Sequence, residues 1–445
     1  MGDISNFIAK MNWDKIPIEV QSMVKKCLID TLGVALSAHR TTAAKIAKEV
    51  AEEQFGASKF SNSKFLAFSG NASVTGAAMA GAFLIDSVDA HDGHSLAKGH
   101  AGATIVPALI AFANNIYHQG GKVSGKFFLE ALLIGYEVSL RNGIIMHTTS
   151  SEYHSSGSWT AVGTAAMGSY LYKLSAKKTK HSLGIAEYHG PKSPMMRCID
   201  YPTMLKDGAG FGALAGTSAV FFAKKGFSGE PAILIKNANE KDYFVRYETL
   251  KQYFKPWPVC RWAQPAIQAV SDLKEDYNIN YENIKKVIIT TFHNALRLNN
   301  NKITSTEQAQ YSIGYPVAVM LIFGKLTVTE ISNNLSSDNR IQKLQNKIKI
   351  IENSKYNNAF PKKRYASVEI IMNNGVSYKK SDIQAKGDYD YAPLTDKEID
   401  DKFYFYSKDY LSKTKAEELN KTIKNLENYP DISMLLDMVC GTSKI

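Results

Sequence analysis

The stretch FKPWPVCRWAQPAIQAV, Phe254–Val270, divides the chain into two parts of different character. Before it, helix follows helix, and segments such as Ile16–Ala38 carry apolar residues at helical spacing. After it come β-branched runs typical of strands, Ile284–Phe292 and Tyr365–Met372. The second run leads into Asn374-Gly375, a pair that favours a tight hairpin turn. The sequence therefore predicts a helical unit followed by an α+β unit.

Helical patterning returns near the C-terminus. Thr395 and Glu398 have the spacing of a capping box, which marks the first turn of a helix. We therefore predict a mainly α protein with an inserted α+β domain, in which both ends of the chain build one large all-helical domain. The predicted boundaries are 1–254 for the first helical part, 255–385 for the α+β domain and 386–445 for the C-terminal helical part.

The stretch GAGFGALAG, Gly208–Gly216, contains G-x-G-x-x-A, which imitates a dinucleotide-binding fingerprint. A true fingerprint follows a strand and opens a βαβ unit, and no strand signal precedes this one. Small residues at this density instead allow helices to approach each other closely. We predict a tightly packed helix here and no nucleotide cofactor.

Composition places the chain among ordinary folded proteins. Its 445 residues are 44% apolar and 21% charged, and the formal net charge is +11. Much of that charge lies in Lys-rich and Asn-rich stretches such as Asn339–Arg364, which are typical of solvated faces. No helix-turn-helix, RNP-type or zinc-finger pattern accompanies the charge, so nucleic-acid binding is not expected. A basic enzyme that attracts an anionic small molecule is the other interpretation.

The sequence contains no strong pattern for a membrane-spanning segment, a signal peptide or a cysteine motif. The longest nearly uncharged apolar run, Ala103–Ala113, is about half of the ~20 residues that a bilayer-spanning helix needs. The N-terminus lacks the layout of a signal peptide. Cys27, Cys198, Cys260 and Cys440 are dispersed without a C-x-x-C pair, which argues against a zinc knuckle or disulfide framework. We expect a cytoplasmic protein with reduced cysteines and no membrane partner.

The stretch SVDAHDGHSLAKGHAG, Ser87–Gly102, gathers three histidines, two aspartates and a lysine. Side chains such as Asp89, His91 and His100 can bind Zn²⁺ or Fe²⁺. However, the H-E-x-x-H helix pattern is missing, and the interspersed glycines argue against a regular helix. We predict a loop that presents acid/base groups and holds no metal. A catalytic metal site and a purely structural hydrogen-bonded loop are the alternatives.

Further polar groups stand at the ends of small-residue helices or beside prolines. His154 lies just ahead of a predicted helix start, where an anionic ligand is favoured. Lys206 precedes the Gly-rich helix, and Lys255 and Arg261 flank two prolines. Each cation alone is typical of a surface charge. If they converge with His100, they would form a pocket for a polycarboxylate, because buried carboxylates need charge-assisted donors.

Six motifs appear in the order and spacing of the MmgE/PrpD family, which the chain resembles over nearly its whole length. They are AHDGHSLAKGHAGATIVPALIA (90–111), YHSSGSWTAVGTAA (153–166), MLKDGAGFGALAGTSAVFFAKKGFSGEPAI (204–233), FKPWPVCRWAQPAI (254–267), AQYSIGYPVAV (309–319) and AKGDYDYAPLTDKEIDDKF (385–403). The resemblance implies a large all-helical domain with a smaller α+β lid domain and an active site between them. It also implies a homodimer that works without a tightly bound cofactor.

The resemblance implies roles for five residues. The first acidic residue of the family's D-x-D-D-T segment falls on Asp89, and the family's two site histidines fall on His100 and His154. Its two site lysines fall on Lys206 and Lys255. We predict Asp89, His100, His154 and Lys206 as catalytic. The predicted substrate-binding residues are Lys255, Arg261, His94 and Gly93.

Four positions depart from the family pattern. His91 stands where the family has Asp, Gly93 where it has Thr, Ala101 where it has Pro, and Gln264 replaces a common His. These changes leave the fold prediction intact and bear on the substrate. The loss of a hydroxyl-bearing side chain at Gly93 would enlarge the pocket.

The chemistry shared by such family members passes through a carbanion next to a carboxylate. We predict dehydration of 2-methylcitrate or a similar hydroxy acid as the reaction. Decarboxylation of cis-aconitate and epimerisation of a small dicarboxylate such as iminodisuccinate are alternatives on the same scaffold. A metal-dependent hydrolase built on the histidine loop is the alternative from another class.

Overall fold

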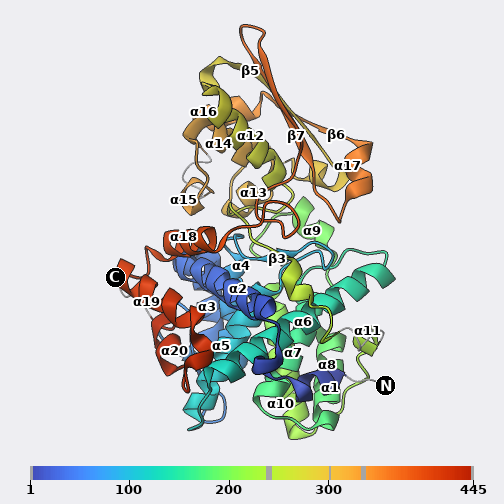
Figure 1. Cartoon of the computed structure of the whole chain (residues 1–445), viewed down its shortest axis with the longest axis vertical. Coiled ribbons are helices and arrows are strands. Elements are labelled where there is room, and N and C mark those ends of the chain that lie inside the picture. Colours follow the sequence, from blue (N-terminus) through green and yellow to red (C-terminus); the bar gives the residue numbers. More distant parts are fainter. Residues whose placement is uncertain (1–3, 237–242, 300–301, 332–336, 442–445) are drawn as a thin grey trace.

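The computed structural model describes residues 4–236, 243–299, 302–331 and 337–441. Figure 1 shows a large helical body with a smaller α+β domain above it, and α18–α20, in red, run back along the body. The helices of the body are α1 (Ile4–Lys10), α2 (Ile18–Ser37), α3 (Thr42–Gln54), α4 (Val74–Asp86), α5 (Gly102–His118), α6 (Gly125–Thr149), α7 (Gly157–Leu171), α8 (Ala176–His189), α9 (Met195–Asp200), α10 (Ala209–Lys225), α11 (Ile233–Lys236), α18 (Asp396–Ser407), α19 (Lys413–Lys424) and α20 (Ser433–Val439).

Small residues hold the centre of the helical body together. A Cβ added at Gly212 of α10 would lie 2.7 Å from the Cα of Gly157 in α7, so these two helices pack backbone against backbone. A Cβ at Gly163 of α7 would lie 1.9 Å from Ser139 Oγ of α6. The prediction of a tightly packed helix after Gly208 is therefore confirmed: this G-x-G stretch serves helix packing.

The C-terminal helices complete the body rather than forming a separate unit. Helix α18 lies against α2, and the Lys402 ammonium pairs with the buried Asp30 carboxylate at 2.5 Å. The predicted capping box is confirmed, because the Thr395 side chain accepts from the Glu398 backbone and the Glu398 side chain accepts from the Thr395 backbone. This cap fixes the start of α18 close to the end of the α+β domain.

The α+β domain contains one four-stranded sheet in the order β6-β5-β7-β8. Strands β5 and β6 are parallel, whereas β5 pairs antiparallel with β7 and β7 antiparallel with β8. The predicted hairpin at Asn374-Gly375 is confirmed as the turn between β7 and β8. The elements are α12 (Gln264–Tyr277), β5 (Ile284–Thr291), α13 (Thr306–Gln310), α14 (Gly314–Phe323), α15 (Val328–Ile331), α16 (Asn339–Gln345), β6 (Ile348–Glu352), α17 (Ser354–Ala359), β7 (Ala366–Met372) and β8 (Ser377–Ile383).

The two domains have separate apolar cores. The core of the helical body continues to Phe254 and resumes at Ile399. The second core runs from Val259 to Met372 and also takes in Met195 and Ile199 of α9. The chain thus changes cores next to Lys255, and α9 reaches from the helical body toward the other domain. Within the described residues, every helix is too short or too polar to cross a bilayer.

Candidate active site

The histidine loop, Ser87–Gly102, joins α4 to α5. It pairs with the segment that leads to Lys255. Two short strands, β3 (Gly93–His94) and β4 (Gln252–Tyr253), pair antiparallel, with Gly93 opposite Tyr253. Asp89 has a φ of +57°, in the left-handed region that non-glycine residues avoid. Such strain is stored where the surrounding structure enforces it. The prediction of an irregular loop that presents polar groups is confirmed.

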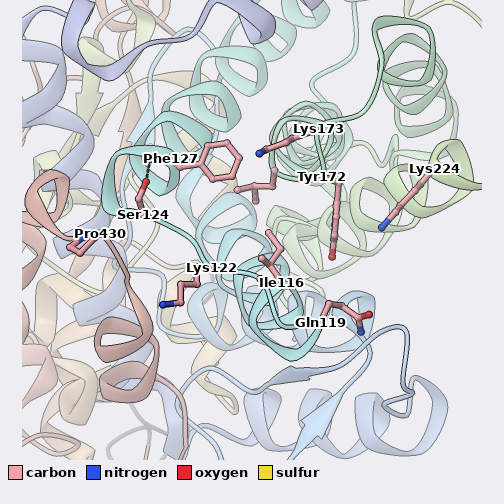
Figure 2. Close-up of a pocket in the computed structure, with 11 residues that line it drawn as sticks. Ile116, Gln119, Lys122, Ser124, Phe127, Tyr172, Lys173, Lys224 and Pro430 are labelled. Carbon is pink, nitrogen blue, oxygen red and sulfur yellow. Dashed lines mark hydrogen bonds between the residues drawn. The ribbon is translucent and has the colours of Figure 1, made fainter.

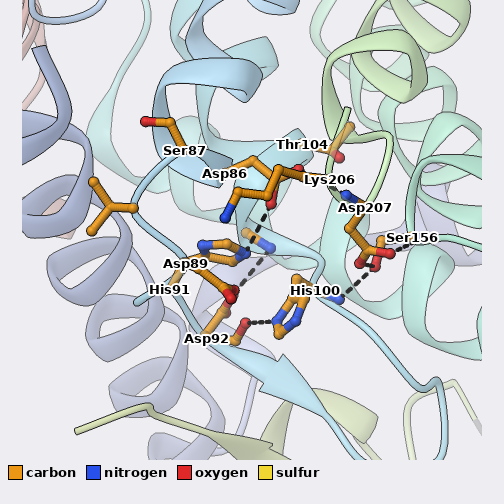
Figure 3. Close-up of polar contacts among 12 residues, drawn as sticks. Asp86, Ser87, Asp89, His91, Asp92, His100, Thr104, Ser156, Lys206 and Asp207 are labelled. Carbon is orange, nitrogen blue, oxygen red and sulfur yellow. Dashed lines mark hydrogen bonds and ion pairs between the residues drawn. The ribbon is translucent and has the colours of Figure 1, made fainter. Parts of the chain in front are cut away.

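A small cavity, with a volume of about 20 Å³, lies between the two domains, beside this loop. Residues of both domains form its wall: Asp89, Lys98, Gly99, His100, Tyr153, Met195, Asp207, Tyr253, Cys260, Arg261, Trp262, Tyr311 and Arg364. Figure 3 shows the polar groups on the helical side, with Asp89, His91 and Lys206 on one side of His100 and Ser156 and Asp207 on the other.

His100 is held as a neutral base. Its Nδ1 lies 2.6 Å from the backbone carbonyl oxygen of Asp92, so Nδ1 carries the proton and donates it to that carbonyl. The other ring nitrogen, Nε2, then keeps its lone pair. Burial, followed by the charge of Lys255, lowers the pKa of His100 to about 3. His100 therefore stays unprotonated at neutral pH and can accept a proton from a bound molecule.

Asp89 and Lys255 form a buried ion pair. Lys255 Nζ lies 2.5 Å from Asp89 Oδ1, and the Lys255 side chain has no exposed surface. Burial alone would raise the pKa of Asp89, but Lys255 and Lys206 outweigh burial and lower it. Burial likewise opposes the charge on Lys255, and Asp89 raises the pKa of Lys255 above its usual value. Both groups are therefore charged at neutral pH.

Lys206 lies at the edge of the same cluster. Its φ is +49°, and its ammonium donates to the side-chain oxygen of Gln310, which comes from the α+β domain. The ammonium also lies 5.2 Å from the centre of the Tyr311 ring, a cation–π distance. Burial raises the pKa of the nearby Asp86 to about 6, although Lys206 opposes that rise. Lys206 thus carries positive charge into the domain interface.

Asp207 is a site residue that sequence reasoning missed. It accepts hydrogen bonds from the backbone N–H and the hydroxyl of Ser156, and the Ser156 hydroxyl oxygen accepts from the His100 backbone N–H. Burial and then the nearby Asp86 raise the pKa of Asp207 to about 8. The carboxyl is therefore mostly protonated at neutral pH. Its position next to Lys206 was the only sequence signal, and nothing in the sequence showed that it is buried.

His154 and His94 lie outside the cavity wall. The His154 backbone N–H donates to His147 Nε2 at 3.2 Å, and His154 forms an isolated β-bridge with Pro194. His94 accepts from the Ala97 backbone through Nδ1 and faces the Glu248 carboxylate through Nε2, at 3.5 Å. Their predicted roles in catalysis and substrate binding stay predictions. The structure brings His100, Asp89, Lys255 and Lys206 together, without His154.

Gly93 and Arg261 both contact Tyr253. A Cβ at Gly93 would lie 2.5 Å from Tyr253 Cζ and Oη and 2.7 Å from His100 Nδ1. The expectation that Gly93 enlarges the pocket is therefore wrong, because the Tyr253 phenol fills that space. Arg261 lines the cavity, where its guanidinium stacks 4.7 Å from the Tyr253 ring centre and pairs with Asp388 at 2.5 Å.

Arg364 contradicts the interpretation of Asn339–Arg364 as a solvated face throughout. Its side chain is buried, it lines the cavity, and its Nη1 donates to Ser95 Oγ of the histidine loop at 2.7 Å. The run of lysines before it gave no sign of this, because a buried arginine and a surface lysine look alike in a basic stretch. Tyr253 was missed for a similar reason, since an aromatic residue in a short strand is usually core.

One group of side chains has the composition of a metal site. Ligand atoms of Asp89, His91 and His100 all lie within 4.8 Å of one another. However, Lys255 already holds one oxygen of Asp89, and burial together with His100 and Lys255 lowers the pKa of His91 well below its usual value. A divalent cation here would face two ammonium groups, those of Lys255 and Lys206. These two ammonium groups oppose the binding of a cation, and the Asp89 and Asp86 carboxylates beside them balance their charge.

A larger hollow lies in the helical body, away from this cavity (Figure 2). Its volume is about 670 Å³, and three lysines at its rim, Lys122, Lys173 and Lys224, provide its charge. Lys224 lies over the Tyr172 ring and Lys173 over the Phe127 ring. No histidine, cysteine or carboxylate belongs to its lining as far as the described chain goes. It therefore lacks the acid/base pair that the smaller cavity has.

Two family models match the chain, one for each part. The MmgE/PrpD N-terminal domain matches residues 2–252, and the MmgE/PrpD C-terminal domain matches residues 257–428. The short gap between the two matches, residues 253–256, contains Lys255 and is where the chain leaves the first apolar core. Together they span both walls of the cavity.

Curated relatives match the chain at low identity, some over nearly its full length and one over about half of it. The cis-aconitate decarboxylase-like protein oryM of Aspergillus oryzae is 22% identical, with 99% of this chain and 97% of the relative covered. The cis-aconitate decarboxylase of Homo sapiens is 24% identical, with 94% and 90% covered. A mitochondrial 2-methylcitrate dehydratase of Yarrowia lipolytica is 24% identical over 48% of this chain and 46% of its own length.

Proposed function

Because the chain belongs to the MmgE/PrpD family, we propose that it is a lyase that acts on a small polycarboxylate without a cofactor. We propose dehydration of 2-methylcitrate, or of a similar hydroxy acid, as its reaction. This proposal is supported by two groups of one cavity wall whose pKa values burial shifts in opposite directions. His100 is a neutral base, with a pKa lowered to about 3, and Asp207 is a protonated acid, with a pKa raised to about 8.

This pair of groups suits the elimination of water. Environments that push the pKa values of two groups apart identify the acid and the base of a proton-transfer site. His100 Nε2 takes the proton from the carbon next to a carboxylate, and that C–H electron pair forms the new C=C bond. The C–O bond breaks as Asp207 gives its proton to the departing hydroxyl, which leaves as water. Exchange with solvent then returns His100 and Asp207 to their starting protonation.

The cations around the pair support the developing negative charge. Lys206 lies behind the cavity wall, with its ammonium on Gln310, and its positive charge stabilises the enediolate that forms on the substrate carboxylate without direct contact. Lys255 has a different task, because its charge is matched by Asp89 at 2.5 Å. It keeps Asp89 ionised beside His100. A substrate carboxylate entering the cavity raises the pKa of His100, because it offsets the positive charges that lower it, and so makes the imidazole a stronger base.

Decarboxylation of cis-aconitate is the second candidate. The relatives that this chain matches at full length include cis-aconitate decarboxylases, whereas the 2-methylcitrate dehydratase matches about half of it. Loss of CO₂ needs a proton donor for the carbanion but no base for a C–H proton. The two reactions therefore make different demands on His100, which is the basis of the test.

Purified protein incubated with 2-methylcitrate, citrate, cis-aconitate and iminodisuccinate separates these possibilities. Dehydration produces the absorbance of a conjugated enoate, decarboxylation releases CO₂, and epimerisation changes optical rotation. His100→Gln should lower kcat for dehydration by about 10²–10⁴-fold, the usual contribution of a general base. His293→Gln, at an exposed histidine of the α+β domain, is the matched control and should leave kcat unchanged. If none of the four acids reacts, the substrate assignment fails.

We also propose that the protein is a homodimer, with an apolar face beside Lys206 as its interface. Tyr201, Leu205 and Phe211 are 74%, 65% and 49% exposed and line one shared hollow to which Lys206 also belongs. Exposed apolar groups gathered in this way are typical of a protein–protein contact. A second copy of the chain is the occupant that the family resemblance implies.

A further inference from the structure

Arg364 is a buried arginine whose charge has no acidic partner. It lies two residues before β7 in the α+β domain, is 4% exposed, and lines the same cavity as His100. Its Nη1 donates to the neutral Ser95 hydroxyl at 2.7 Å, and its Nε is buried without any hydrogen bond. Within the described parts of the chain, no carboxylate lies at ion-pair distance from its guanidinium.

Two other buried cations near the cavity do have carboxylate partners, whereas Lys206 donates to the neutral Gln310 amide oxygen. Lys255 pairs with Asp89, and Arg261 pairs with Asp388, each at 2.5 Å. A guanidinium stays charged at any pH that a protein tolerates. Burying it without an anion costs several kcal/mol. The fold therefore carries a cost at Arg364 that a bound anion would offset.

The surroundings of Arg364 point to an anion of small size. The centres of the Tyr253 and Phe360 rings lie 5.9 and 5.8 Å from its guanidinium carbon and occupy space beside it. Lys98 is half-buried in the same wall and makes no ion pair with any described carboxylate. Burial and then the positive charge of Arg364 lower the pKa of Lys98, because the two cations repel each other. This side of the cavity thus holds two positive charges without counter-charges.

We propose that Arg364, with Lys98 beside it, anchors a carboxylate of the substrate away from the reacting carbon. This inference rests on the proposed function, because it names the group that selects a substrate with more than one carboxylate. A guanidinium binds a carboxylate through two parallel N–H···O bonds, and this geometry also fixes orientation. The base and acid come from the helical body and the anchor comes from the α+β domain. Substrate selection therefore requires both domains.

The test uses tricarballylate, a tricarboxylate without a hydroxyl group to eliminate, and isothermal titration calorimetry on the full-length protein. Arg364→Met should bind tricarballylate about 10- to 100-fold more weakly than wild type, the effect of losing a hydrogen bond to a charged group. Arg364→Lys keeps the charge but cannot form two parallel hydrogen bonds. Its affinity for tricarballylate should lie between those of wild type and Arg364→Met. Arg340→Gln, at an exposed arginine of the same domain, should bind like wild type.

Thermal unfolding separates an anchor from a structural role. Because Arg364 is an unpaired buried charge in the free protein, Arg364→Met should leave the Tm of the ligand-free protein unchanged or raise it. The rise in Tm that tricarballylate gives the wild type should be lost. A lowered Tm with unchanged tricarballylate affinity would overturn the proposal, as would a wild type that does not bind tricarballylate. If tricarballylate binds through Arg364 but no acid is converted, the anchor stands and the proposed lyase reaction fails.

Discussion

Lys255 Nζ lies 2.5 Å from Asp89 Oδ1, and this ion pair joins the histidine loop to the point where the chain leaves the helical body. Asp89 holds a left-handed backbone conformation, and Lys255 also donates to its backbone oxygen at 3.2 Å. The pair therefore fixes the loop that presents His100 and keeps two charges buried. Separating the two residues would leave two buried charges unpaired, which costs free energy.

Removing one partner of this pair should cost more than removing both. Lys255→Met leaves the Asp89 carboxylate buried and unpaired, and we expect the free energy of unfolding to fall by about 3–5 kcal/mol. Asp89→Asn should have a comparable cost, because it leaves the Lys255 ammonium unpaired. The double variant should be more stable than either single variant when unfolded by urea. Strictly additive losses would contradict the coupling.

Activity should fall as pH rises through about 8, because Asp207 then loses the proton that it gives to the leaving group. Asp207→Asn keeps the hydrogen-bond geometry with Ser156 but cannot donate a proton as an acid. We expect it to lower kcat by about 10²-fold or more. The alkaline limb of the pH profile of kcat/KM should be absent from its residual activity. An unchanged alkaline limb would assign that titration to another group.

The Asp207 carboxyl should also make the free energy of unfolding depend on pH. Its pKa is about 8 in the folded protein and 3.8 in the unfolded chain, so the folded state binds the extra proton between these values. Its contribution to the free energy of unfolding is complete below pH 3.8 and is lost as pH rises toward 8. Urea titrations of wild type and Asp207→Asn between pH 5 and pH 8 measure this. The variant should show the smaller loss of stability with rising pH.

A chelator should not affect turnover. Asp89, His91 and His100 bring their ligand atoms within 4.8 Å of one another, but Lys255 and Lys206 place positive charge beside them. Dialysis against EDTA, with dialysis against buffer as control, should therefore leave kcat unchanged. Stoichiometric zinc or iron in the purified protein, lost together with activity, would instead support the metal-dependent hydrolase.

The proposed interface predicts a change in oligomeric state. Tyr201→Glu combined with Leu205→Glu places two charges in the exposed apolar face, where the cost of burying them exceeds any gain from contact. Light scattering should show a wild-type dimer and a monomeric variant with the same thermal unfolding profile. Ile18→Glu, at an apolar residue that is 73% exposed at the start of α2, is the control and should stay dimeric. A monomeric wild type would refute the interface.

The fold class could be predicted because its signals are local. Hydrophobic spacing identified the helices, and Asn374-Gly375 and the Thr395–Glu398 box marked a turn and a cap that the structure has. The charge states in the cavity could not be predicted in this way. Asp207 and Arg364 matter because of burial and of neighbours more than 50 residues away in the chain, such as Ser156 and Ser95. A sequence pattern shows neither the burial of a residue nor its neighbours from distant parts of the chain.

The contacts of Gly93 with distant residues are likewise invisible in the sequence. A side chain there would press on Tyr253 and on His100, and His100 cannot retreat because its Nδ1 is held by Asp92. Gly93→Ala should displace the imidazole and lower kcat by about 10²-fold, the cost of a misplaced catalytic group. It should also lower the free energy of unfolding by about 1–3 kcal/mol, through overpacking.

Gly314→Ala is the matched control for this change. It lies at the start of α14, where an added Cβ would meet nothing closer than Gln345 Nε2 at 3.9 Å, and it should leave both kcat and stability near wild type. A second variant shows which neighbour is decisive. Gly93→Ala with Tyr253→Leu should regain stability, because the collision with the phenol is gone, and should regain little kcat while the contact with His100 persists. Full recovery of kcat would mean that Tyr253 alone transmits the effect.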